Sequence, residues 1–307
     1  MTQTYLDNLQ EQCKSASSVV ENAPLNIDDV ITGKQQEIFI KNSSGIVSQI
    51  FMGTNSFGYK RNIFMSVIPK SWTDEQMQGE NIWYVPGEPE ISKDVAYEKA
   101  VEYINKMNIG LVFYSTEPCS LVTDSIDLHT GWTLVFTKKI SNLQAEYRDG
   151  VNTRVNPDAL PSYGAPWPPE VLIMAVDKEG ICSISWMGAS KIESTLAETA
   201  ELEKFDEIKN RIANQLNFIS GTDENANGFG LDIEVNKIEL GISLLSEKNK
   251  SDVGQYLPTW YVSFKWKWRD QQDSDENWSE DQIMFNAIDG SYVEPRVTNA
   301  DLMRNSQ

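Results

Sequence analysis

The residue spacing that most resembles a known chemical site lies at residues 223–234, which run DENANGFGLDIE. Asp223, Asn225 and Asn227 stand at alternate positions, a glycine follows them, and Glu234 closes the segment. Ca²⁺ loops of the EF-hand type need this arrangement, because oxygen ligands at alternate positions and a final bidentate glutamate surround the ion. The spacing makes these four residues candidate calcium ligands, and we expect weak affinity because only two of them carry charge.

The same segment also fits a plain loop. Asn227 and Gly228 form a dipeptide that is typical of turns. The residues that follow, 231–240, alternate between apolar and polar side chains as a strand does, whereas an EF-hand continues into a helix. Calcium is thus the one cofactor that the sequence leaves open, and no other cofactor is expected.

A second candidate site is the proline-rich segment 163–170, YGAPWPPE. Tyr163 and Trp167 would stand on a loop stiffened by prolines, and exposed aromatic rings on such a loop can stack on a sugar or a peptide. The same rings would serve as a cap if the loop folds back over a sheet. Both interpretations stay open, and Tyr163 and Trp167 are candidate ligand-binding residues.

No catalytic residue can be assigned from the sequence. His129 is the only histidine and lies in a polar stretch, so a zinc site rich in histidine is excluded. The phosphate-loop patterns and the GxSxG nucleophile pattern do not occur. Asp177 and Asp289 each precede a glycine turn, and we expect them to hydrogen-bond the turn backbone rather than form a catalytic pair.

Composition and charge restrict the partners. The 307 residues include 45 acidic and 26 basic ones, which gives a net charge of −19. Such a charge repels phosphate backbones and anionic lipid, so nucleic acid is excluded as a partner. The same charge is compatible with a role in solubility and with the binding of cations or basic peptides. No apolar stretch reaches the ~18 residues of a transmembrane helix.

The N-terminus and the cysteines bear on the compartment. Residues 1–20 lack a basic region followed by an apolar one, so we expect neither a signal peptide nor a lipoprotein cleavage box. The chain is then either cytoplasmic or lost a leader before this numbering began. Cys13, Cys119 and Cys182 are scattered along the chain. A bridge between Cys119 and Cys182 stays open for an oxidising compartment, although the apolar surroundings of Cys182 favour a buried thiol.

Periodicity predicts the elements that would position these residues. Ser92 and Asp94 mark the start of a helix that ends near Met107. A second helix is expected over residues 191–216, where apolar residues recur at helical spacing. Apolar alternation predicts strands over 35–67, 111–114, 131–140, 231–246 and 257–268.

One hairpin pattern occurs twice. Residues 171–187 and 283–297 are each an apolar run that reaches Ala-Val-Asp or Ala-Ile-Asp, turns at a glycine and enters a second apolar run. The order helix, strand, strand, hairpin then also appears twice. We therefore predict an α+β fold of two repeated helix plus antiparallel-sheet units, preceded by a smaller N-terminal β-rich segment. The expected divisions are 1–90, 91–190 and 191–307.

The repeated unit is similar to the PepSY-type unit of secreted bacterial proteins. The set GWTLVFTKKI, YGAPW, VDKEGICSISW, LEKFDEI and FNAIDGS, in this order, resembles an uncharacterised lipoprotein family of clostridia and related Firmicutes, known as a domain of unknown function. The resemblance covers residues 91–297, and the lipobox cysteine of such proteins is absent. It implies PepSY-like repeats and an extracytoplasmic, cell-surface location, with membrane attachment only through a removed N-terminal lipid signal. It implies no mechanism.

These observations favour a non-catalytic extracytoplasmic protein with a binding or regulatory role toward a peptide, a cell-wall component or a protein partner. This hypothesis predicts an exposed apolar or aromatic patch. The alternative is a carboxylate-dependent hydrolase of the cell envelope, which predicts two carboxylates ~5–10 Å apart and a raised pKa for one of them. A calcium-stabilised structural module is the third hypothesis.

Overall fold

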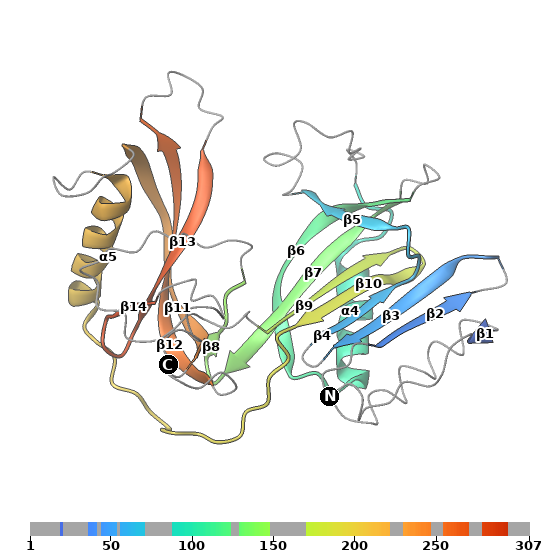
Figure 1. The fold of residues 1–307 in the computed structure, drawn as a ribbon, viewed down its shortest axis with the longest axis horizontal. Coiled ribbons are helices and arrows are strands. Elements are labelled where there is room, and N and C mark those ends of the chain that lie inside the picture. The colour runs from blue at the N-terminus through green and yellow to red at the C-terminus, as the bar shows by residue number, and fades with distance from the viewer. Residues whose placement is uncertain are drawn as a thin grey trace, which may run out of the picture. The chain divides into compact units, whose positions relative to one another are not determined.

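The protein falls into two compact units. Unit 1 comprises residues 1–138 and 170–191, and unit 2 comprises residues 139–169 and 192–307. In the described part of each unit a helix lies on an antiparallel sheet (Figure 1). The structure, a computed structural model, describes residues 19–20, 36–41, 44–53, 56–70, 88–123, 129–147, 170–221, 230–246, 254–269 and 278–293.

The sheet of unit 1 has the strand order β1-β2-β3-β4-β10-β9-β7-β6-β5, and all neighbours are antiparallel. The last two residues of β7 belong to unit 2, where they pair with β8 (Leu143–Gln144). The strands of the sheet are β1 (Val19–Val20), β2 (Gln36–Lys41), β3 (Val47–Gly53), β4 (Ser56–Lys60), β5 (Ser66–Pro69), β6 (Leu111–Val122), β7 (His129–Ile140), β9 (Val171–Asp177) and β10 (Gly180–Met187).

The predicted α+β class of two repeated helix plus sheet units is wrong. The protein is mostly β, since strand residues far outnumber helix residues in the described ranges, and its two sheets differ greatly in size. The N-terminal strands form no separate segment, because β4 pairs with β10 and β5 pairs with β6. Alternation along residues 35–67 indicates that strands form there. It does not indicate their partners, because pairing between strands far apart in sequence leaves no local pattern.

Helix α4 (Lys93–Lys106) of unit 1 begins where the sequence predicts. The Ser92 hydroxyl accepts a hydrogen bond from the backbone N–H of Val95 at 3.3 Å, and Asp94 lies in the first turn, where its charge complements the helix dipole. The helix packs on β9 and β10. Its buried face consists of Ala96, Ala100, Tyr103 and Ile104.

The apolar core of unit 1 lies between α4 and the sheet. On β7 the alternate residues Trp132, Leu134 and Phe136 all join this core, as the alternation predicts. The Trp132 indole N–H also donates to the carbonyl of Ile91 at 2.9 Å, which ties the chain before α4 to the sheet. The other strands contribute Ile38, Ile40, Ile50, Met52, Phe57, Leu172, Met174, Val176 and Ile184.

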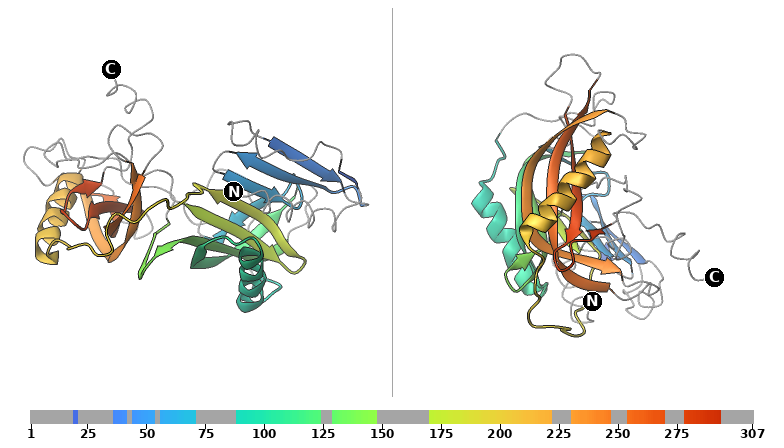
Figure 2. Two further views of the ribbon diagram at one scale, coloured as in Figure 1. Left: turned by 90° about the horizontal axis from the view of Figure 1, so that it is seen from below. Right: turned by 90° about the vertical axis from the view of Figure 1, so that its left-hand side faces the viewer.

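The sheet of unit 2 has the order β11-β12-β13-β14, and α5 (Phe205–Ser220) lies across one of its faces (Figure 2). On β12 the alternate residues from Trp260 to Trp268 join or pack against the core beneath α5, as expected for the apolar alternation of this strand. The centre of that core comprises Ile208, Ile212, Val262, Phe264, Ile283 and Phe285. The strands are β11 (Leu231–Ser246), β12 (Gly254–Trp268), β13 (Ser279–Asn286) and β14 (Tyr292–Val293).

Helix α5 is shorter than the predicted helix, because it begins only at Phe205. Residues 191–204 belong to no helix or strand. A helical segment gains most of its stability by packing an apolar face, and the apolar side chains of this segment are largely open within the described structure: Ile192 is 50% and Leu196 76% exposed. Among the described residues, neither helix has the length and apolar character to cross a membrane.

Candidate functional site

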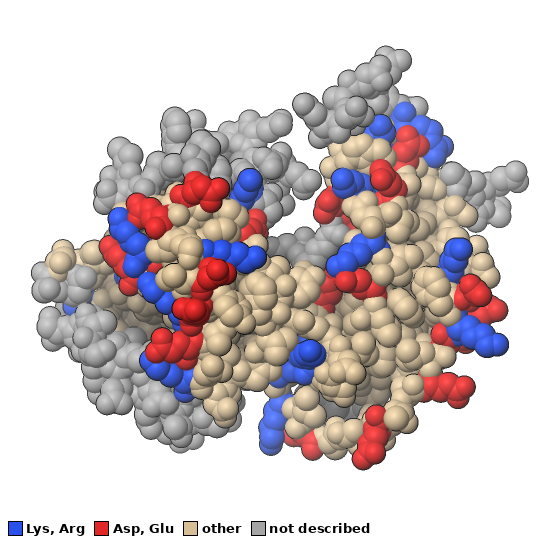
Figure 3. Space-filling model, turned by 180° about the vertical axis from the view of Figure 1, so that it is seen from behind, with Lys and Arg blue, Asp and Glu red and all other residues tan. Residues whose placement is uncertain are grey.

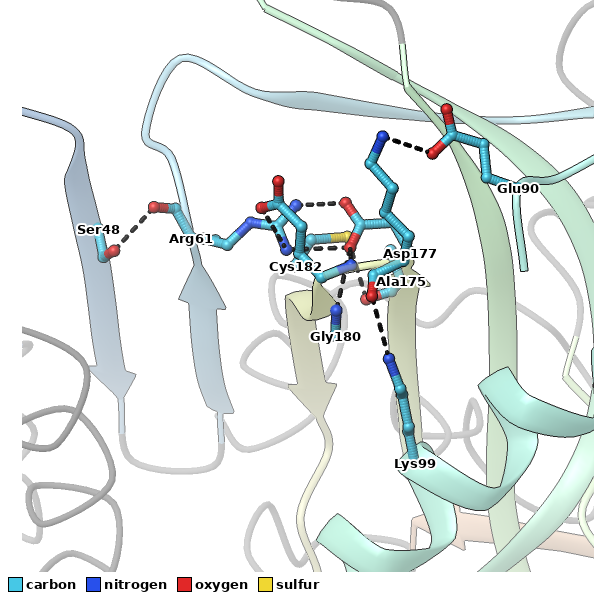
Figure 4. Close-up of polar contacts among 10 residues, drawn as sticks. Ser48, Arg61, Glu90, Lys99, Ala175, Asp177, Gly180 and Cys182 are labelled. Atoms are coloured by element: carbon cyan, nitrogen blue, oxygen red, sulfur yellow. Dashed lines mark hydrogen bonds and ion pairs between the residues drawn. The ribbon is translucent and has the colours of Figure 1, made fainter. Parts of the chain in front are cut away.

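A buried carboxylate holds the β9–β10 turn of unit 1 (Figure 4). Asp177 is the last residue of β9, and its side chain is only 2% exposed. Its Oδ1 accepts hydrogen bonds from the backbone N–H groups of Glu179 at 2.9 Å and Gly180 at 3.2 Å. The prediction that this aspartate binds the turn backbone is confirmed.

Arg61, which follows β4, completes this cluster (Figure 4). Its Nη1 donates to Asp177 Oδ1 at 3.0 Å, and its Nη2 pairs with Oδ2. The Arg61 backbone N–H donates to the carbonyl of Cys182 at 2.8 Å, and the Arg61 carbonyl accepts from the Ser48 hydroxyl at 2.7 Å. One arginine therefore ties together β3, β4, β9 and β10.

The electrostatics of Asp177 are those of a structural ion pair. Burial alone would raise the pKa of its carboxyl, but the Arg61 guanidinium and the two turn amides outweigh burial and hold that pKa below its usual value. A general acid in glycoside hydrolysis needs the opposite shift. This partnership leaves no local pattern in the sequence, because Arg61 lies 116 residues from Asp177.

The second hairpin, in unit 2, does not repeat this arrangement. Its strand β13 ends at Asn286, whose Oδ1 accepts from the backbone N–H of Ile288 at 2.9 Å. Asp289 lies further on, within the turn, and accepts from the backbone N–H of Ser291 at 2.9 Å. Asp289 thus also binds turn backbone, but Asn286 is the positional counterpart of Asp177.

Two free thiols lie in unit 1 beside the Asp177 turn. Cys119 on β6 and Cys182 on β10 are buried in one small cluster with Met65, Leu121 and Ala175. Strands β7 and β9 lie between β6 and β10 in the sheet, and the two thiols are free rather than joined by a disulfide. Burial raises the pKa of the Cys119 thiol to about 11 and also raises that of Cys182, which makes both poor nucleophiles at neutral pH.

A β-bulge explains why Cys182 lies in this cluster. Between Ile181 and Ser183 the register of β10 against β9 shifts. Ile181 and Ile184 consequently both pack toward the core beneath α4, while Cys182 joins the separate thiol cluster. Simple alternation would place Cys182 on the same face as Ile184.

Most of the candidate ligand residues from the sequence fall outside the described residues: Tyr163, Trp167, Asp223, Asn225 and Asn227. Glu234 is described, and it lies exposed on β11 opposite Lys265 of β12. A strand therefore follows the candidate calcium loop. Within the ranges that the structure describes, no group of three or more acidic, histidine or cysteine side chains is placed to hold a metal ion.

An exposed apolar surface lies in unit 2 where the chain enters α5. Leu202, Phe205 and Ile288 are 38%, 42% and 38% exposed. The backbone N–H of Glu203 donates to the carbonyl of Ala287 at 2.8 Å, which brings the neighbouring Leu202 and Ile288 close together. We call this the α5 entry surface, and it comprises Leu202, Phe205, Trp260 and Ile288.

Trp260 is the half-buried member of the α5 entry surface. Its ring lies 5.0 Å from that of Phe205, at an interplanar angle of 52°. Its indole Nε1–H is buried, and no residue in the described part of the chain accepts a hydrogen bond from it. A buried donor without an acceptor costs about 1–3 kcal/mol, so a ligand carbonyl that reached this atom would be stabilising.

Charged side chains of both signs are mixed over the face drawn in Figure 3. The sheet of unit 2 shows the same mixing, since Asp232 lies opposite Lys267 and Glu234 opposite Lys265. Residues 192–207 differ, because they include six acidic residues and a single lysine. The entry to α5 is therefore locally acidic.

The fold and the site define a mostly β protein of two antiparallel sheets, with the Asp177 carboxylate engaged in structure and an open apolar surface on unit 2. No family model matches the chain, and no curated protein matches it, so the expected match to a clostridial lipoprotein family is absent. Among solved structures, the C-terminal domain of YpeB from Bacillus megaterium is similar over 95% of each chain, with a TM-score of 0.39 and 8% identity. At that score the likeness carries no argument about activity.

Proposed function

We propose that this chain is a non-catalytic binding protein that engages a peptide or protein partner through the α5 entry surface. The observation that carries the proposal is an exposed set of large apolar side chains beside Trp260, whose buried indole Nε1–H lacks an acceptor among the described residues. Contiguous apolar side chains left open to solvent are typical of interaction sites. A partner would cover these side chains, and a shift of the exposed Phe205 ring would let a partner carbonyl accept from Trp260.

The buried carboxylates of unit 1 give the hydrolase hypothesis no support. Asp177 pairs with Arg61, and Glu170 pairs with Lys138. Hydrolysis by two carboxylates needs one group held protonated near neutral pH, away from such cationic partners. No observation on the described residues favours the calcium-stabilised module.

A selection from a displayed random-peptide library tests the binding role. Peptides enriched on the wild-type chain should bind Phe205→Ser and Ile288→Ser about tenfold more weakly in calorimetric titrations, a loss of ~1.4 kcal/mol each. Val235→Ser is the matched control, because Val235 is also 42% exposed and lies on β11 of the same unit. A library that yields no binder, or equal losses in all three variants, would reject the proposal.

The proposal keeps an extracytoplasmic location, which the sequence resemblance implies. Fractionation of the native host with an antibody against this chain tests that part separately. We expect to recover the chain in the envelope or the medium. Recovery in the cytoplasm alone would reject the extracytoplasmic location, but it would not bear on the proposed binding role.

A further inference from the structure

The chain that leads into α5 has an open backbone. Residues 192–202, which we call the entry arm, belong to no helix or strand and form the coil that connects β10 to α5 (Figure 1). Among the described residues, none of their backbone groups forms a hydrogen bond with another backbone group, and the first such bond is made by Glu203. Unpaired backbone N–H and C=O groups can accept a partner strand.

The entry arm carries apolar and acidic side chains together. Its apolar members are Ile192, Leu196 and Leu202, and its acidic members are Glu193, Glu198 and Glu201. Leu196 is 76% exposed. The arm therefore offers both apolar contact and negative charge.

We propose that the occupant of the α5 entry surface is a basic peptide that adds to the entry arm as a β-strand. This inference rests on the proposed binding function and names its partner. Six acidic residues against one lysine in residues 192–207 select a positively charged partner. The unpaired backbone selects an extended one, because a strand satisfies the N–H and C=O groups of both chains. Leu202 belongs both to the arm and to the α5 entry surface, so an apolar side chain at that end of the peptide reaches Phe205.

Three fluorescein-labelled peptides test the inference on the full chain. The first alternates lysine with threonine and valine and ends in leucine, the second has glutamate for every lysine, and the third keeps the lysines but has proline at two strand-forming positions. Fluorescence anisotropy should show the second and third binding about tenfold more weakly than the first, because one reverses the charge and the other removes ladder donors. The amides of residues 192–202 should gain protection from hydrogen exchange with the first peptide. No added protection there would overturn the inference.

Matched variants separate specific binding from general attraction to an acidic protein. A triple substitution in the arm, Glu193→Gln with Glu198→Gln and Glu201→Gln, should weaken the first peptide about tenfold. The control triple, Glu234→Gln with Glu239→Gln and Glu280→Gln, removes the same charge from exposed positions on β11 and β13 and should leave the affinity within about twofold. Equal effects of the two triples would overturn the inference.

The same titrations distinguish the failure of this inference from that of the proposed function. If Phe205→Ser abolishes binding while the arm triple has no effect, the basic strand is wrong and the α5 entry surface still binds a partner. If Phe205→Ser and Ile288→Ser leave every bound peptide unaffected, the proposed function is wrong as well.

Discussion

Lys138 and Glu170 form a buried ion pair at the two positions where the chain leaves unit 1 and returns to it. Lys138 Nζ lies 2.8 Å from Glu170 Oε2, and the two side chains are 13% and 2% exposed. The Ser190 hydroxyl donates to the same oxygen at 2.7 Å, next to the last residue of unit 1. One carboxylate therefore fixes all three points at which the chain crosses the border of this unit.

Removing that carboxylate should destabilise unit 1. Glu170→Ala leaves the Lys138 ammonium buried without its partner, and we expect a loss of about 3 kcal/mol, seen as a lower midpoint in urea unfolding. Glu239→Ala is the control, because Glu239 pairs with Lys237 where the side chains are 46% and 54% exposed, and such pairs contribute at most ~1 kcal/mol. A small, equal loss in both variants would contradict the structural role of Glu170.

Asp177 should make the stability of unit 1 depend on pH. Its folded-state pKa lies below the unfolded value of ~3.9, so the contribution of the carboxylate is complete above that value and is lost as the pH falls through the folded pKa. Asp177→Asn keeps the shape of the side chain but removes the charge that pairs with Arg61. The difference in unfolding free energy between wild type and variant should be largest above about pH 5 and shrink below about pH 4. Denaturant titrations at several pH values measure it, and a difference independent of pH would contradict the ion pair.

The parts of the fold that the sequence predicts are those with a local signature. Ser92 starts α4 because a hydroxyl at that position caps the first turn, and the alternation from Trp260 to Trp268 places one face of β12 on the core. Asp177 likewise binds the turn that its own sequence makes. Each of these depends on residues a few positions apart.

What the sequence does not predict depends on distant residues. The partner of Asp177 lies on another strand, and the pairing of β4 with β10 leaves no trace in either segment. The α5 entry surface is missed for the same reason. Phe205 fits the apolar stripe of a longer helix, and Ile288 fits a hairpin, so only the folded backbone brings them together.

Cys119 and Cys182 should resist alkylation in the folded protein. With its pKa raised to about 11, about one Cys119 thiol in a thousand is ionised at pH 8, and burial also blocks access to the reagent. Site-resolved mass spectrometry after treatment with iodoacetamide should find both cysteines unmodified in the native protein and fully modified in urea. Rapid native labelling of either thiol, or a disulfide between the two on a non-reducing map, would contradict the buried arrangement.

Gly241 on β11 should tolerate no side chain, because a backbone segment of unit 2 crosses the sheet at this point. A Cβ at position 241 would lie 2.5 Å from the carbonyl oxygen of Gln144 and 2.8 Å from the ring of Tyr261. Gln144 is held by the pairing of β8 with Lys139, and the Tyr261 hydroxyl is hydrogen-bonded to Ser243 at 2.7 Å. Neither neighbour can move without breaking one of these bonds.

Gly241→Ala should therefore lower the unfolding free energy of unit 2 by about 2 kcal/mol, the usual cost of forcing an extra carbon into a packed site. Gly110→Ala is the matched control, because a Cβ at position 110 meets no atom within 4 Å. The control should be neutral or slightly stabilising, since alanine restricts the unfolded chain. Thermal and urea unfolding of both variants measure the difference. If Gly241→Ala is as stable as Gly110→Ala, residues 143–144 do not pack on β11, and the β8 segment is not part of unit 2.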